Sequence, residues 1–449
     1  GIERREFLKI SGMALGGCAL PGLVGSDALA AAHASRKAVI LVCLPGGPPQ
    51  LDTWDPKPEL TKFGGKKLPL ANLTTERETG VALASPFKFK QHGDSGTWVS
   101  DALPHIAEHV DDIAIVRSMF NNHPNHEPAL FKIHSGRLLP GRPAIGAWVT
   151  YGLGNINQNL PAYVVLDDPI GLPTQGIKNW QSGWLPPIFQ GTRLRSEGSP
   201  ILNLEAKDEF PTPVRDLARD LLSRLSAKHR DQRPFQPDLD ARIASYELAA
   251  RLQLSATDAL DVSQESEATR EMYGINKKVS SSYGRRCLMA RRLVERGVRY
   301  VQIYIEQQIW DNHSGLEKNL RYCCNKTDQP IGGLIRDLKQ RGLLDSTLLV
   351  WGGEFGRLPL SQGGDGRDHG PAGFTTWMAG GGIKGGTAYG NTDDTGYKAV
   401  ENRVSVHDFH ATILHSLGLD YKKLIYNHNG LDEKPTGQQP ARVVKEILA

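Results

Sequence analysis

The chain has 449 residues, of which 39% are hydrophobic, and its 53 basic and 49 acidic residues leave a net charge of +4. This composition allows a large buried core, and the near balance of charge, without a long basic run, gives no reason to expect nucleic acid as a partner. The 48 glycines and 28 prolines predict many loops. The five cysteines lack the CxxC spacing of a metal site and do not indicate a disulfide-built scaffold.

The first residues resemble an export signal of the twin-arginine type. Arg4 and Arg5 precede a mildly apolar stretch, and residues 28–30 (ALA) form a small-x-small cleavage signal. We therefore predict that residues 1–35 are a signal segment read by the twin-arginine export machinery, and that the mature protein is periplasmic or otherwise extracytoplasmic. The apolar stretch is too short and too rich in glycine to span a bilayer, so we predict no transmembrane helix in the mature chain.

Two alternatives for this segment stay open. Residues 15–18 (LGGC) resemble a lipobox, which would give a lipid-anchored form through Cys18. The same stretch could instead form an ordinary amphipathic helix.

After the signal segment, short apolar runs that predict buried strands alternate with segments of helical periodicity. The predicted elements are, in chain order, the strand Lys37–Leu44, the helix Ala102–His109, the strand Asp112–Arg117, a helix between Asn125 and Gly136, the helix Ala144–Leu153, the strand Tyr163–Leu166, the helix Ser281–Arg296, the strand Val298–Ile305, the helix Thr327–Arg341, the strands Leu348–Trp351 and Phe374–Met378, and the helix Ser405–Leu417. This alternation predicts an α/β fold with a mainly parallel sheet flanked by helices.

A further stretch of helical periodicity lies between two of these strands. It runs from Val214 to about Glu267, with Leu, Ile and Ala at spacings of three and four. We therefore predict one domain over residues 36–449 that contains a helical insertion at about residues 205–290.

Capping signals mark the ends of two predicted helices. Asn125 is a candidate N-cap and Gly136 a candidate C′ residue, which places His126 on the first turn. Ser405 and Asp408 have the spacing of a capping box at the start of the last helix.

Carboxylates and imidazoles follow several predicted strands. Glu354 comes just after the strand that ends at Trp351, and Asp311 and His313 are two residues apart, so that both project to one side of an extended segment. Further candidate ligands are Asp52, Asp368 and His369. Because the carboxyl ends of parallel strands meet at one edge, these residues predict a site for a divalent metal, zinc, manganese or calcium. The alternative for each pair alone is a hydrogen-bonded loop.

Other histidines lie on two predicted helices. His126 would lie at a helix N-terminus, where anions dock, and we expect the helix field and nearby cations to lower its pKa. His123 and His134 lie close in sequence, with surface or capping roles as the alternative. His407 and His410, three apart on the last helix, are interpreted as structural.

Several motifs are specific in combination. They are the twin-arginine start, LPGGPPQLDTWDPKP, RSMFNNHPNHEPALFKIHSGR, AIGAWVTYGLG, ARRLVERGVRYVQIY, WDNHSG, WGGEFGR and GRDHGP. Together they resemble the bacterial family called domain of unknown function 1501, over nearly the whole chain. That family is grouped with the alkaline phosphatase and sulfatase superfamily, so the resemblance implies an alkaline phosphatase-like fold and metal-dependent hydrolysis of phosphate or sulfate esters.

The resemblance also implies roles for individual residues. Glu354 would replace a metal-binding Asp of the superfamily, and Phe355 stands where the superfamily has a His. His369 resembles a later metal ligand, and Asp311 and His313 resemble the residues that complete the shell of the same metal.

The nucleophile segment of sulfatases resembles HEPALFKIHSG, and here the chain departs from the pattern. His126 falls on the nucleophile position, where no Ser, Thr or Cys is present, and Leu130 occupies an Arg position. His126 is therefore either a metal ligand or a phosphoryl-accepting nucleophile.

The leading hypothesis is an exported metal-dependent hydrolase of anionic esters, either small molecules or glycans, with His126 and His123 as catalytic candidates. One metal would be held by Asp311, His313 and His369, with Asp368 as a further candidate, and a second metal by Asp52, Glu354 and His126. The alternative is a non-catalytic, metal-stabilised protein of the same fold that recognises an extracellular glycan or protein.

Overall fold

The computed structural model describes residues 37–68, 75, 77–198, 211–233, 236, 239–240, 242–244, 246–248 and 258–449. The predicted signal segment, residues 1–35, lies outside this part of the chain.

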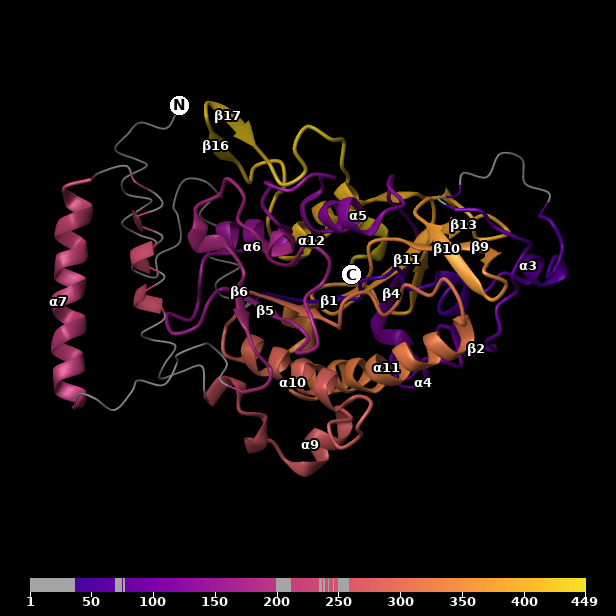
Figure 1. The fold of residues 1–449 in the computed structure, drawn as a ribbon, viewed down its shortest axis with the longest axis horizontal. Helices are drawn as coiled ribbons and strands as arrows, with labels where there is room; N and C mark the ends of the chain where they lie inside the picture. Colours follow the sequence, from indigo (N-terminus) through magenta and orange to yellow (C-terminus); the bar gives the residue numbers. More distant parts are fainter. Residues whose placement is uncertain are drawn as a thin grey trace.

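A nine-stranded sheet forms the centre of the molecule, with strand order β12-β4-β11-β8-β1-β7-β5-β6 and β15 paired with β4 (Figure 1). Its strands are β1 (Ala38–Cys43), β4 (Ile113–Phe120), β5 (Tyr163–Leu166), β6 (Thr192–Leu194), β7 (Tyr300–Tyr304), β8 (Thr347–Gly352), β11 (Phe374–Ala379), β12 (Thr387–Tyr389) and β15 (Val404–Ser405). The neighbours β8, β1, β7, β5 and β6 are all parallel, while β11 runs antiparallel to both β8 and β4.

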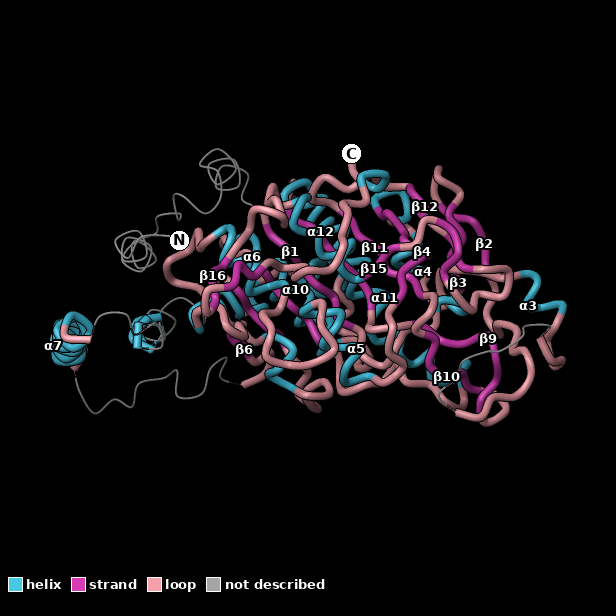
Figure 2. Tube along the Cα trace, turned by 90° about the horizontal axis from the view of Figure 1, so that it is seen from above, coloured by secondary structure: helices cyan, strands magenta, loops and turns pink. Residues whose placement is uncertain are grey.

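Helices cover both faces of this sheet (Figures 1 and 2). One face carries α4 (Pro104–Ala107), α10 (Ser281–Glu295) and α11 (Leu316–Gln340), and the other carries α5 (His126–Ser135), α6 (Ile145–Leu153) and α12 (Val406–Ser416). The residues of β1 alternate between the two buried clusters, with Ile40 and Val42 in one and Val39 and Leu41 in the other, as the period of two in a strand requires. Because β1 is buried on both faces, its sequence is an unbroken apolar run.

Smaller elements surround this core. They are α3 (Pro58–Lys62), α7 (Thr212–Asp231), α9 (Glu267–Met272), β2 (Phe89–His92), β3 (Thr97–Ser100), β9 (Gly356–Gln362), β10 (Gly366–Gly370), β13 (Asn391–Thr392), β14 (Ala399–Glu401), β16 (Tyr426–His428) and β17 (Leu431–Glu433). The predicted fold class, an α/β fold with a mainly parallel sheet flanked by helices, is confirmed by this arrangement.

The capping signals are also confirmed. Asn125 occupies the N-cap position of α5, although its side chain forms no capping hydrogen bond, and Gly136 ends that helix with a positive φ of 74°. In α12 the side chain of Ser405 accepts a hydrogen bond from the backbone of Asp408, whose own side chain accepts one from the backbone of Ser405. Such signals act between residues a few positions apart, so they can be read from sequence alone.

One predicted helix is longer in the structure than in the prediction. The helix predicted from Thr327 begins at Leu316 instead, and Leu320, Cys323 and Cys324 on its earlier turns are buried. The prediction failed because many polar residues separate these apolar positions, and only packing on the sheet shows which side of the helix is buried.

A hairpin that was not predicted follows Glu354. The glycine-rich segment after Glu354 forms the antiparallel strands β9 and β10, so that Asp368 and His369 lie within a strand rather than after one. Most residues of the two strands are buried, although Arg357, Arg367 and Asp368 are charged, so the sequence lacks the apolar alternation that predicts a strand.

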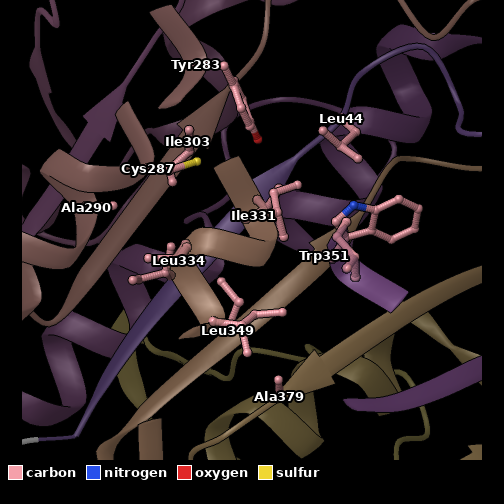
Figure 3. Packing of buried hydrophobic residues seen from close by; sticks show 14 of the residues in the cluster. Leu44, Tyr283, Cys287, Ala290, Ile303, Ile331, Leu334, Leu349, Trp351 and Ala379 are labelled. Atoms are coloured by element: carbon pink, nitrogen blue, oxygen red, sulfur yellow. The ribbon is translucent and has the colours of Figure 1, made fainter. Parts of the chain in front are cut away.

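The helices of the predicted insertion differ in their surroundings. Helix α7 stands apart from the layers on the sheet, whereas α10 packs directly on it (Figure 1). Figure 3 shows Cys287 and Ala290 of α10 close to Ile303 of β7 and Leu334 of α11. Since α10 is a core helix, the insertion stays a prediction for the residues that precede it.

Membrane-spanning character was sought along the described chain. No helix there is both long enough and apolar enough to cross a bilayer.

Candidate metal centre

The candidate centre lies where β1, β7 and β8 end. These strands are paired in parallel register, so the residues that follow them meet at one edge of the sheet. The turn after β1 needs glycine, because Gly46 has a φ of 112° and a Cβ there would lie 2.6 Å from the backbone nitrogen of Asp311. This close approach brings the segment after β7 against the turn after β1.

Three imidazoles converge on one oxygen of Asp311. The Nε2 atoms of His126, His313 and His369 lie 3.3, 2.8 and 3.1 Å from Asp311 Oδ1. His126 comes from the start of α5, His313 from the loop after β7, and His369 from β10. Residues far apart in sequence therefore present the same nitrogen to a single point. Within the described chain, His126, Asp311 and His369 form a group whose ligand atoms all lie within 4.8 Å of one another.

Two of these imidazoles are held in place through their other nitrogen. His126 Nδ1 lies 2.5 Å from Glu354 Oε1, which also accepts a hydrogen bond of 2.9 Å from the backbone N–H of Gly46. His313 Nδ1 contacts the side-chain oxygen of Gln362. Because both partners accept hydrogen bonds, Nδ1 of each ring donates to them, and Nε2 is the nitrogen that faces Asp311.

These Nε2 atoms are poorly satisfied by the protein itself. Among the described residues, the Nε2 atoms of His126 and His313 are buried without a hydrogen-bond partner, although a carboxylate oxygen is close. A nitrogen lone pair that faces an anionic oxygen is repelled by that oxygen unless a proton or a cation lies between the two atoms. The donors, three imidazole nitrogens and one carboxylate oxygen, are of the types that bind divalent transition metals. The residues present therefore fit a metal ion.

Without a cation, a proton on His126 takes this place between the imidazole and the carboxylate. Burial opposes protonation of His126, but the adjacent carboxylates of Asp311 and Glu354 outweigh burial and raise its pKa to about 9. The predicted lowering of the pKa of His126 is therefore wrong when only groups of the protein act on the ring. The two carboxylates raise the pKa more strongly than burial lowers it. Burial would raise the pKa of Asp311, but the three imidazoles and Arg357 hold it well below its usual range.

Arg357 is a residue of the centre that sequence reasoning missed. It is 1% exposed, and its guanidinium contacts Asp311 Oδ1 and the carbonyl oxygens of Gly46, Gly47 and Arg367. It thus ties the turn after β1 to the carboxylate and to β10. The signal was available, since an arginine closes the motif WGGEFGR, but its position three residues after Glu354 gave no indication of burial.

Phe355 forms an apolar wall of the centre. Its ring centroid lies 4.8 Å from those of both His126 and His369. Phe355 thus supplies packing at this position instead of a further ligand.

Three predicted site residues have other partners. Asp52 is 0% exposed, and its two carboxylate oxygens accept hydrogen bonds of 3.0 and 2.7 Å from Arg367. Asp368 Oδ2 accepts one from the backbone of Arg77, and its Oδ1 lies 4.0 Å from His313 Nδ1. His123 Nδ1 accepts one of 3.1 Å from the backbone of Asn125. The structure thus gathers His126, Asp311, His313, His369 and Glu354, and places Asp52, Asp368 and His123 around or outside them.

The fold and the site together define an α/β protein with a histidine and carboxylate centre at the carboxyl edge of its sheet. Residues 36–448 match the family described as "Protein of unknown function (DUF1501)", and the chain belongs to this family. No curated protein has a significant match to this chain.

Solved structures with some similarity to this chain include three bacterial proteins. The lipoteichoic acid synthase LtaP from Listeria monocytogenes is 10% identical, over 92% of this chain and 78% of its own, with a TM-score of 0.39. The PsFucS1 sulfatase from Pseudoalteromonas sp. is 12% identical over 93% and 72% of the two chains, with a TM-score of 0.36. A protein in the alkaline phosphatase superfamily from Vibrio parahaemolyticus is 8% identical over 94% and 78%, with a TM-score of 0.32. At such low similarity, the reaction has to be argued from the site of this chain.

Proposed function

We propose that this protein is an exported metal-dependent hydrolase of anionic esters, which are phosphate or sulfate esters. One observation carries the proposal: the Nε2 atoms of three imidazoles meet at Asp311 Oδ1, and two of them are buried without a hydrogen-bond partner. A bound cation would accept lone pairs from the three imidazole nitrogens and would neutralise the charge of the Asp311 carboxylate.

The metal ligands in this proposal are His126, His313, His369 and Asp311. Glu354 and Gln362 orient the imidazoles by accepting hydrogen bonds from Nδ1. Three imidazoles favour zinc or manganese over calcium, which prefers oxygen ligands throughout. Bound there, the cation would polarise an ester oxygen and lower the pKa of a water molecule.

The two proposed roles of His126 exclude each other. Because Nδ1 is taken by Glu354, only Nε2 can act as a ligand or attack a substrate. That atom points toward Asp311 together with His313 and His369, which favours the role of ligand. The three imidazoles and Arg357 hold the pKa of Asp311 low, which favours the role of ligand over that of proton acceptor.

Turnover tests this proposal. Protein loaded with zinc or manganese is assayed on p-nitrophenyl phosphate and p-nitrophenyl sulfate, with and without chelator. We expect hydrolysis of at least one ester that chelator abolishes and added metal restores. If protein that carries its full metal content hydrolyses neither ester, the proposal that it is an enzyme of this class is rejected.

The second candidate function is a metal-stabilised binding protein that recognises an extracellular glycan or protein. Two observations favour it: His126 replaces a hydroxyl or thiol nucleophile, and the Phe355 ring packs against the rings of His126 and His369. It predicts that bound metal raises the melting temperature while both esters remain intact.

Export is the remaining part of the proposal. Arg4 and Arg5 support translocation of the folded, metal-loaded protein, although this segment lies outside the described residues. Replacing both by Lys is expected to trap precursor in the cytoplasm, as measured by cell fractionation. Unchanged export of this variant would reject the twin-arginine route.

A further inference from the structure

A surface pocket lies at the same edge of the sheet as the metal centre. It has a volume of about 570 Å³ and lies where β4 and β15 end, with Phe120 and Ser405 in its lining. These two residues are paired in parallel register. Strand β4 runs in the same direction as β8 because both are antiparallel to β11, which lies between them. The end of β4 is therefore two strands, or about 10 Å across the sheet, from the end of β8.

The pocket also adjoins the loop that positions the metal centre. Asn122 lines the pocket, while its neighbour Asn121 donates a hydrogen bond of 2.9 Å to the backbone oxygen of Glu354. Lys132 lines the pocket from α5, the helix whose first residue is His126. The loop before α5 and helix α5 itself thus contribute residues both to the candidate metal centre and to the pocket.

Basic side chains dominate the pocket. Lys132, Arg403 and Arg442 line it, with Asp408 as the acidic residue among the lining side chains. Asp408 is occupied, since its carboxylate accepts hydrogen bonds from Ser405 and from the backbone of Arg442. The pocket therefore carries a net positive charge.

Two of these cations lack a partner of opposite charge. In the described structure, neither Lys132 nor Arg403 forms an ion pair, whereas Arg442 approaches Glu446. Lys132 is half-buried, and burial together with the nearby charge of Arg137 lowers its pKa. Arg403 lies over the ring of Phe120, 4.2 Å from its centroid, which holds the guanidinium at the pocket. Two unpaired cations held at a pocket are a binding site for an anionic group.

We infer that this pocket, lined by Lys132 and Arg403, binds a second anionic group of the substrate while the reacting ester lies at the metal centre. The substrate class is then a polyanionic oligomer. This inference rests on the proposed function for the reaction but not for binding. The anionic group is a sulfate, a phosphate or a carboxylate, and the probes below separate these three.

Direct binding tests the inference independently of catalysis. The probes are a heparin-derived tetrasaccharide, sodium tripolyphosphate and tetragalacturonic acid, each titrated by calorimetry at low and high salt. We expect at least one of them to bind, with affinity that falls as salt rises. The variant Arg403→Gln, alone and with Lys132→Gln, should weaken that binding by about tenfold or more. Because the side chain of Arg403 is exposed, the single variant Arg403→Gln should fold normally, so a loss of binding in it reports on the pocket.

The control variants separate this inference from the proposed function. Lys422→Gln with Lys423→Gln removes the same charge away from the pocket and should leave binding unchanged. In the His369→Ala background, in which the metal centre is altered, Arg403→Gln should still weaken binding, whatever the effect of His369→Ala on ester hydrolysis. The inference is overturned if none of the three probes binds, or if binding is the same in the Arg403→Gln and Lys132→Gln double variant as in the wild type.

Discussion

The two ends of helix α5 carry histidines of opposite chemistry. At its first turn, His126 joins His313 and His369 around the Asp311 carboxylate. Near its other end, His134 belongs to a second group with His407 and His410 of α12, which we call the buried histidine cluster. Both groups contain three histidines and take one of them from the same helix.

Their hydrogen-bond partners differ in charge. In the buried histidine cluster, His407 Nε2 donates to the backbone oxygen of Gly136 at 2.9 Å, and His410 Nε2 donates to that of Ile133 at 2.8 Å. His134 Nε2 lies 2.9 Å from the hydroxyl of Tyr304. Each of these three Nε2 atoms has a separate neutral partner, so the nitrogens do not converge on one point.

The pKa values follow from these partners. Burial, with a smaller effect of His410, lowers the pKa of His134 to about 3, and burial lowers that of His410 to about 4. His126 is also largely buried, but two carboxylates raise its pKa to about 9. The comparison teaches that the partner's charge, and not the imidazole or its helix, separates a candidate metal ligand from a structural histidine.

The largest expected effect is on metal content. His369→Ala removes one of three converging nitrogens and should lose most of the transition metal that the wild type retains after dialysis. The matched control, His410→Gln, can still donate to the Ile133 carbonyl and should retain its metal. Elemental analysis measures both. Equal metal in wild type and His369→Ala would contradict the assignment of the centre.

The same helix allows a second comparison, between its two histidines. His126→Ala should lower metal content and esterase activity together, because a ligand is lost, whereas His134→Gln should change neither. A nucleophile would behave differently, since its loss spares the metal and abolishes turnover. Full metal with normal activity in His126→Ala would show that His126 only begins its helix.

A smaller effect is expected from the carboxylate that orients His126. Glu354→Gln keeps the size of the side chain but removes its charge, and should weaken metal affinity by about 10- to 100-fold. Competition with a chromogenic chelator measures this affinity. Glu317→Gln, on the exposed side of α11, is the charge control, and an equal affinity in both variants would exclude the orienting role.

The smallest expected effect is a loss of folding stability at acidic pH, caused by the buried histidine cluster. Because His134 and His410 have lowered pKa values, the unfolded chain binds more protons below its ordinary histidine pKa of 6.5, so stability should fall as pH decreases from there toward about 4. Near pH 5 the loss should be about 2 kcal/mol per histidine. Urea unfolding with chelator present, which removes the metal effect, should show a shallower pH dependence for His410→Gln. An identical slope in that variant would contradict the lowered pKa.

The sequence by itself determined the features that depend on neighbours along the chain. The apolar runs of β1 and β5, the ends of α5 at Asn125 and Gly136, and the capping box of Ser405 and Asp408 are local patterns with local physical causes. The order of strands and glycine turns also predicted that Asp311, Glu354 and their neighbours would meet at one edge of the sheet.

Only the tertiary structure decided which candidate side chains share a partner. Asp52 and Asp311 look alike in the sequence, but Arg367 binds the first and three imidazoles surround the second. Arg357 is buried at the centre because the hairpin of β9 and β10 folds against the turn after β1. These outcomes depend on contacts between residues far apart in the chain, and burial and charge act through such contacts, which no local pattern encodes.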